Sequence, residues 1–147
     1  MAFHFVLAAV LRLRQSVERQ RTLQLQEASL KVSRAMAKLA EVDQSLRESA
    51  ELNAAALQAG RTAAEIQFRG LVRENLQKFG VELQADIAKF EIVRQAALVE
   101  YQRAYRDREI LETLRASQRR IYKQEELRRQ QQELDAAYLL QRWHRRD

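Results

Sequence analysis

The near absence of residues that end helices is the strongest constraint on what this chain can fold into. Its 147 residues include no proline and only three glycines. Sheet folds need frequent turns, and turns depend on these two residue types. Charged residues make up 31% of the chain, and alanine, leucine and glutamine supply much of the remainder. This combination predicts long helices of the kind found in coiled coils.

One segment has the features of a helix break, and it surrounds Gly60. A glycine readily adopts the left-handed conformation that often follows the last turn of a helix. Thr62 and Glu65 have the spacing of a capping box, which satisfies free N–H groups at a new helix start. Gly70 and Gly80 have no such cap nearby, so we expect them inside a helix, each at a cost of roughly 1 kcal/mol relative to alanine. The chain should therefore turn at Gly60 and not at Gly80.

The predicted fold is all-α: an antiparallel two-helix coiled-coil hairpin forming a single domain over residues 1–147. The first helix should cover about residues 3–59, the turn about 60–62, and the second helix about 63–143. Because the second helix is longer, we expect it to overhang from about Gln118 onward with no partner in the same chain. A lone polar helix is only marginally stable in water, so the overhang is expected to need a partner to be well ordered.

Both helices carry apolar residues at the alternating three- and four-residue steps of a heptad repeat. In the first helix the seam consists of Ala28, Val32, Ala35, Leu39, Val42 and Leu46. Toward the N-terminus it should continue through Leu25, Val17, Leu13, Val10 and Val6. This continuation needs one additional four-residue step, a stutter, and leaves Arg21 on the seam. In the second helix the seam consists of Leu76, Phe79, Leu83, Ile87, Phe90, Ala97, Tyr101, Ala104 and Leu111.

A turn at Gly60 brings these two seams into one register. The expected facing pairs are Leu46/Leu76, Val42/Phe79, Leu39/Leu83, Ala35/Ile87, Val32/Phe90, Leu25/Ala97, Val17/Ala104 and Val10/Leu111. Several pairs join a large residue to a small one, as interdigitated packing favours. Arg21 would lie opposite Tyr101, where a guanidinium group can stack on the ring.

The chain lacks the residue patterns of catalytic, cofactor and metal sites. It has no cysteine, which excludes disulfides, thiolate chemistry and cysteine zinc sites. His4 and His144 lie near opposite ends and belong to no cluster with ligand spacing. No glycine fits a phosphate-binding loop. We therefore expect no catalytic residue, no metal ligand, no cofactor and no enzyme activity.

Charge and hydropathy indicate where the protein acts. The formal net charge is +6, but acidic residues are interspersed with the basic ones, as on a solvated helix face. Specific nucleic-acid binding is therefore the less favoured class, and DNA binding should be weak and sensitive to salt. No stretch approaches the roughly 20 apolar residues of a membrane span, and the N-terminal apolar run lacks the basic start and cleavage site of a signal peptide. These features predict a cytoplasmic protein without direct membrane insertion.

Arginine is concentrated where the two termini should meet, and several aromatic residues there do not fit the seam. Arginine, tyrosine and tryptophan are enriched in protein-binding hot spots. The candidate partner-binding residues are Arg12, Arg14, Arg19, Arg115, Arg119, Arg120, Tyr122, Tyr138 and Trp143.

Several short segments resemble a known family in their order and spacing. They are Phe3-His-Phe5 with Leu7, Val10–Arg14 and Glu18; Arg108–Arg115; Gln118-Arg119 with Tyr122 and Glu125-Glu126; and Arg128–Asp135. Together they are similar to the flagellar export protein FliJ over nearly the full length of the chain. The family's antiparallel two-helix coiled coil resembles the central stalk of rotary ATPases.

This resemblance implies a component of the bacterial flagellar type III export apparatus. Its expected partners are the hexameric export ATPase and its regulator, the membrane export gate protein, and substrate chaperones. The chain would stimulate the ATPase as its stalk, lie at the cytoplasmic side of the membrane through the apparatus, and bind no nucleic acid. The remaining alternatives are an injectisome stalk protein of similar architecture, a basic nucleic-acid-binding coiled coil, and a generic dimeric scaffold.

Overall fold

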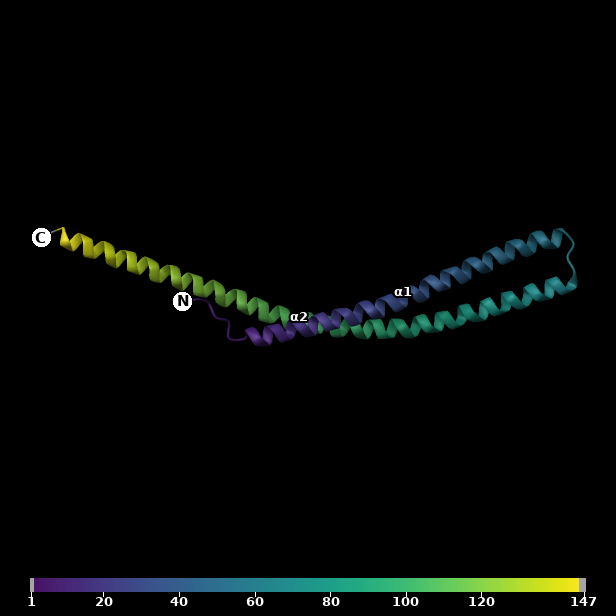
Figure 1. Ribbon diagram of the computed structural model, residues 1–147, viewed down its shortest axis with the longest axis horizontal. Coiled ribbons are helices and arrows are strands. Elements are labelled where there is room, and N and C mark those ends of the chain that lie inside the picture. Colours follow the sequence, from purple (N-terminus) through teal and green to yellow (C-terminus); the bar gives the residue numbers. More distant parts are fainter. Residues whose placement is uncertain (1, 146–147) are drawn as a thin grey trace. The chain divides into compact units, whose positions relative to one another are not determined.

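Two long helices joined by one turn make up nearly all of the structure. The computed structural model describes residues 2–145, in which helix α1 covers Ala8–Gln58 and helix α2 covers Ala63–His144. The helices run antiparallel (Figure 1), and the described residues contain no strand. The predicted all-α helical hairpin with a longer second helix is confirmed, since α2 has 82 residues and α1 has 51.

The contacts between the helices group the chain into two units, which are described separately below. Unit 1 combines Met1–Arg19 with Arg103–Asp147, and unit 2 is the continuous stretch Gln20–Gln102 that contains the turn. The prediction that the chain forms one domain is not tested by this grouping and stays a prediction.

The turn lies in unit 2, between the end of α1 at Gln58 and the start of α2 at Ala63. Gly60 has a φ of 73°, a left-handed conformation that side chains other than glycine rarely adopt. The backbone N–H of Glu65 donates to Thr62 Oγ1 over 3.5 Å, so Thr62 caps the first turn of α2. Gly70 and Gly80 both lie inside α2.

The seam of unit 2 follows the apolar heptad pattern. On α1 its buried members are Ala28, Val32, Ala35, Val42 and Ala56. Leu83 is the buried apolar side chain of α2 in this unit. Eight other predicted seam residues are half-buried: Leu25, Leu39, Leu46, Leu76, Ile87, Phe90, Ala97 and Tyr101. Two-helix packing leaves one side of every seam residue near water, which explains why so few side chains are fully enclosed.

One position of the predicted seam is wrong. Phe79 is 46% exposed, and its neighbour Gly80 is buried in its place. A Cβ atom built on Gly80 would lie 3.6 Å from Val42 Cγ1 and 4.0 Å from Leu39 Cδ1. The two large α1 side chains therefore fill the space above the glycine, and Phe79 is turned away from the seam.

The first three positions of the predicted seam are also wrong, and so is the predicted start of the first helix. Helix α1 begins at Ala8 and not near residue 3; the Ala8 N–H donates to the Phe5 carbonyl over 3.1 Å. Val6, Val10 and Leu13 are exposed, whereas Phe5 and Leu11 are buried. Between Leu11 and Leu25, Val17 is half-buried as predicted, and the polar side chains of Gln15, Glu18, Arg21 and Thr22 are half-buried with it.

Arg21 lies in unit 2 near the position expected for it. Its Nη1 donates to Gln24 Oε1 over 2.9 Å, and its Nη2 lies 3.9 Å from Glu100 Oε2. Arg21 is thus held by an amide and a carboxylate group, and its stacking on Tyr101 stays a prediction.

Candidate protein-binding surface

All of the candidate partner-binding residues fall within unit 1. Three lie on the first turns of α1, and six lie on α2: Arg115, Arg119, Arg120, Tyr122, Tyr138 and Trp143. Their packing depends on how the start of α1 is held against α2. A layer of charged side chains between the two helices holds them.

Glu18 and Arg108 form the centre of this charged layer. They make an ion pair across the two helices, and their side chains are only 17% and 18% exposed. Arg108 also pairs with Glu112, one turn further along α2. Its guanidinium carbon lies 4.9 Å from the centre of the Tyr105 ring, within the range of a cation–π contact. The layer between the helices of unit 1 therefore contains a charge network that the predicted seam did not include, beside the predicted seam residues Val17 and Ala104, which are half-buried and buried.

Two further contacts extend the layer. Gln15 Nε2 donates to Glu112 Oε1 over 3.4 Å, and Arg14 Nη1 donates to Asp107 Oδ2 over 3.2 Å. Burial acts to lower the pKa of Arg108, but its hydrogen bond and charge interaction with Glu18, together with the charge of Glu112, raise the pKa overall. Arg108 is thus permanently cationic and is neutralised by two carboxylates.

The N-terminal segment packs on α2 through aromatic residues. The rings of Phe3 and Tyr122 lie 5.7 Å apart between centroids, tilted by 51°, a favourable aromatic geometry. Phe5 is only 5% exposed. Tyr122 was predicted as a partner-binding residue, but it is half-buried in this intramolecular contact, so at least part of its role is to hold the start of the chain.

The exposed arginines differ in whether they are already paired. Arg14 is engaged by Asp107, in an ion pair whose side chains are 45% and 40% exposed. The other five candidate arginines are exposed and have no hydrogen-bond or ion-pair partner among residues 2–145: Arg12, Arg19, Arg115, Arg119 and Arg120. Their charges are available to another molecule.

Three of these arginines line a shallow groove on α2. Arg115, Arg119 and Arg120 share it with Lys123, Gln124 and Leu127. The sequence analysis did not identify Lys123 or Leu127. Their spacing could have found them, because residues three, four, seven or eight positions from Arg119 and Arg120 lie near the same side of a helix. The groove combines four cationic side chains and one exposed leucine with a single carboxylate, Glu112, which is already paired with Arg108, so its surface is suited to an acidic protein partner.

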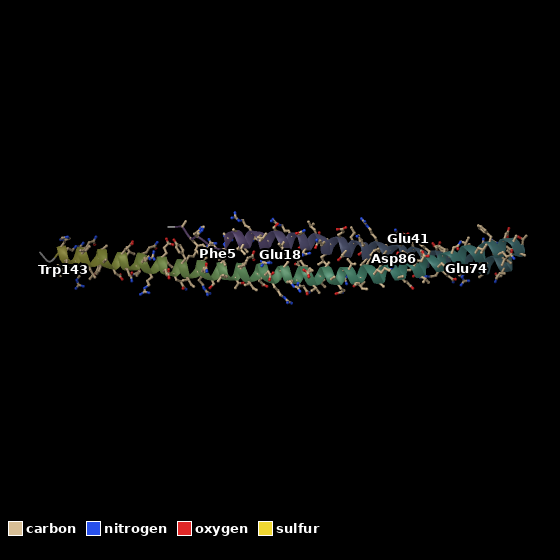
Figure 2. All side chains as sticks on the ribbon, turned by 90° about the horizontal axis from the view of Figure 1, so that it is seen from below. Phe5, Glu18, Glu41, Glu74, Asp86 and Trp143 are labelled. Atoms are coloured by element: carbon tan, nitrogen blue, oxygen red, sulfur yellow. The ribbon has the colours of Figure 1, made fainter. Side chains whose placement is uncertain are left out.

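Beyond Tyr122, α2 continues as a C-terminal extension, which we define as residues 123–144. Every residue of the extension is exposed. Its large apolar side chains are Leu127, Leu134, Tyr138, Leu139, Leu140 and Trp143. Figure 2 shows Trp143 near the end of α2, well beyond Phe5, which precedes the start of α1. The extension thus carries aromatic and aliphatic groups that no other part of unit 1 covers, as an interaction surface does.

The described residues show no sign of a metal site or of a membrane span. No group of three or more His, Cys, Asp or Glu side chains capable of holding a metal ion occurs in residues 2–145. Over that range, neither helix contains an apolar stretch of membrane-spanning length.

Comparison with known proteins relates the chain to a family. The family model described as flagellar FliJ protein matches residues 3–147, essentially the whole chain. No curated protein and no solved structure matches.

Proposed function

Because the chain belongs to the flagellar FliJ protein family, we propose that it acts as the central stalk of the hexameric flagellar export ATPase and stimulates that enzyme. Membership in this family makes it a component of the flagellar export apparatus. The stalk role, the orientation and the individual partners are the parts we propose. The chain itself supplies no catalytic step, since its effect is exerted on the enzyme that it contacts.

The observation that carries the proposal is the C-terminal extension with the basic groove at its base. A single α-helix with its side chains is about 10–12 Å in diameter, slender enough to enter the central opening of a ring of six subunits. The extension is such a helix, because α1 begins at Ala8 and no described residue of unit 1 covers positions 123–144.

The arginines supply the recognition that a ring pore requires. Arg115, Arg119 and Arg120 have no partner among the described residues of the chain, so their donors are free for carboxylates or carbonyl oxygens of the ATPase. Guanidinium groups bind such acceptors in fixed geometry, and charge attraction speeds encounter between the partners. The apolar side chains around Tyr138 and Trp143 would then set how long the complex lasts.

The other expected partners are assigned to the remainder of the chain. We propose that the turn end of unit 2 faces the membrane export gate and that the exposed helix faces receive substrate chaperones. The regulator of the ATPase would also bind the assembled complex. This arrangement puts the chain at the cytoplasmic side of the membrane through its partners, without direct insertion.

Charge reversal tests the stalk role. The double variant Arg119→Glu/Arg120→Glu should bind the ATPase hexamer about tenfold more weakly or worse, because two attractive charges become repulsive. Stimulation of ATP hydrolysis should fall in parallel, with helix content by circular dichroism unchanged. The matched control is Glu48→Arg/Glu51→Arg, which reverses two exposed charges of α1 near the turn and should leave stimulation intact. If the control abolished stimulation and the arginine variant did not, the proposed orientation would be wrong.

A further inference from the structure

A second groove lies beside the turn, entirely within unit 2. The last turns of α1 and the first turns of α2 form it, and its volume is 260 Å³. Ala56, Leu57 and Ile66 give it an apolar lining, with Ala56 buried and the other two side chains 67% and 47% exposed. Three arginines also line the groove; they are called the rim arginines below, and the three apolar residues are called its floor.

Gly70 of α2 is one of the residues that line this groove. The other two glycines have evident structural reasons, because Gly60 needs its positive φ and Gly80 makes room for Val42 and Leu39. Gly70 has neither: its φ is not in the left-handed region, and a Cβ built on it would meet no atom within 4 Å. A glycine inside a helix costs roughly 1 kcal/mol relative to alanine. What the glycine provides here is open space between Leu57, Ile66 and the arginines.

The three rim arginines are not neutralised to the same degree. Arg61 Nε lies 3.9 Å from Glu65 Oε2, and Arg69 Nη1 donates to Asn53 Oδ1 over 3.2 Å. The Asn53 amide has no charge, so the contact fixes the Arg69 side chain without cancelling its charge. Arg73 has no hydrogen-bond or ion-pair partner among residues 2–145. At least two cationic charges therefore border the apolar floor without a counter-charge.

We propose that this groove is a docking site for an acidic segment of a partner protein, which places one or two apolar side chains on the floor and its carboxylates against Arg69 and Arg73. Its volume is below the roughly 300–1,000 Å³ of small-molecule sites, so a few side chains fit it better than a whole ligand. The apolar floor argues against nucleic acid as the ligand. Its phosphate backbone would place negative charges against the apolar side chains of Leu57 and Ile66, which is unfavourable. The charge complementarity selects acidic over basic protein segments.

Gly70→Leu and Arg73→Gln alter the groove in different ways without threatening the fold, and two further substitutions serve as controls. Gly70→Leu fills the open space, and it should improve the helix because no atom obstructs the new side chain. Gly70→Ala has the same benefit for the helix but fills little of the groove. It therefore separates the effect of a more stable helix from the effect of a filled groove. Arg73→Gln removes the unpaired charge and keeps a side chain of similar length. Gln84→Leu, on an exposed position of α2 outside the groove, controls for an added surface leucine.

The probe is a library of random peptides of about three helical turns, roughly 11 residues, displayed on phage and selected on the full chain. The peptides that bind should be rich in Asp and Glu, with leucine, isoleucine or phenylalanine between them. In fluorescence anisotropy, their affinity should fall tenfold or more for Gly70→Leu and about threefold for Arg73→Gln. Gly70→Ala and Gln84→Leu should stay within twofold of the unsubstituted chain.

The opposite results would overturn the proposal. It fails if the selected peptides lack acidic residues, if they bind Gly70→Leu as tightly as the unsubstituted chain, or if no peptide is selected. It also fails if a single-stranded DNA oligonucleotide competes with the selected peptides for the groove and itself binds the Gly70→Leu variant more weakly than the unsubstituted chain. The inference does not rest on the stalk proposal, because the readout is peptide binding at the turn end; Gly70→Leu should leave stimulation of the ATPase unchanged.

Discussion

Glu18 of α1 and Arg108 of α2 form an ion pair in the partly buried layer between the helices of unit 1, next to Val17, which heptad spacing places on the seam. The pair is enclosed enough to be costly if broken, since each side chain is less than one-fifth exposed. Arg108 is also the residue that joins Glu112 and Tyr105 to the same layer. The register of the start of α1 against α2 therefore depends on charge.

Removing one partner of this pair should destabilise the protein. Glu18→Ala leaves Arg108 with less compensation in its partly buried position, and we expect a loss of about 1–3 kcal/mol in the free energy of unfolding, below the range for fully buried pairs. Asp107→Ala breaks the exposed pair with Arg14 and should cost less than about 1 kcal/mol. Urea unfolding followed by circular dichroism measures both. Equal losses of unfolding free energy in the two variants would show that burial does not make the Glu18–Arg108 pair contribute more to stability than an exposed pair.

The double variant Glu18→Leu/Arg108→Leu gives a complementary result. Replacing both charges by apolar groups removes the desolvation cost together with the attraction, so stability should be unchanged or higher. A double variant as unstable as Glu18→Ala would mean that the apolar pair cannot pack at this position.

Gly60 and Gly80 should respond differently to alanine. Gly60→Ala should destabilise the fold by about 1–2 kcal/mol, because its φ of 73° is unfavourable for a residue with a Cβ. Gly80→Ala should instead stabilise by about 0.5–1 kcal/mol, since the new methyl group makes ordinary contacts with Val42 and Leu39. Gly80→Leu should destabilise by about 1–3 kcal/mol through overpacking. Thermal unfolding of the three variants checks this order, and stabilisation by Gly80→Leu would contradict the close packing above Gly80.

The register of unit 2 can be tested by disulfide formation, since the chain has no cysteine of its own. Cysteine pairs at Ala35/Ile87 and at Leu25/Ala97 should each oxidise within one chain, because facing seam positions lie within disulfide reach. Ala37 is exposed on another face of α1, so the matched pair Ala37/Ile87 should stay reduced. Mobility on denaturing gels distinguishes the outcomes. Failure of both seam pairs would rule out the register.

Part of this structure could be predicted from the sequence because part of it follows local rules. The turn needs a glycine with a capping threonine next to it, and both signals lie within a few residues of each other. The central seam is apolar, so spacing alone identifies Ala28, Val32, Ala35 and Val42 as buried. Each of these features is decided by residues close together in the chain.

The errors arose where the deciding partner is distant in sequence. Glu18 alone has the properties of a surface residue, and only Arg108, 90 positions away, makes its inward position favourable. Counting apolar residues also selects Phe79 over Gly80, although the large side chains of Val42 and Leu39 favour the small residue. In the candidate surface, residue type identified exposed arginines. It could not show that the ring of Tyr122 packs against Phe3 of the same chain.

The central claim is that unit 1, through the C-terminal extension, contacts the ring of the export ATPase. A photo-crosslinking amino acid, benzoylphenylalanine, placed at Tyr138 tests it most directly, with Leu52 of unit 2 as the matched position; the two side chains are 64% and 59% exposed. After irradiation with the assembled hexamer, the account predicts a covalent adduct to the ATPase from position 138 and none from position 52. An adduct from position 52 with none from position 138 would contradict it.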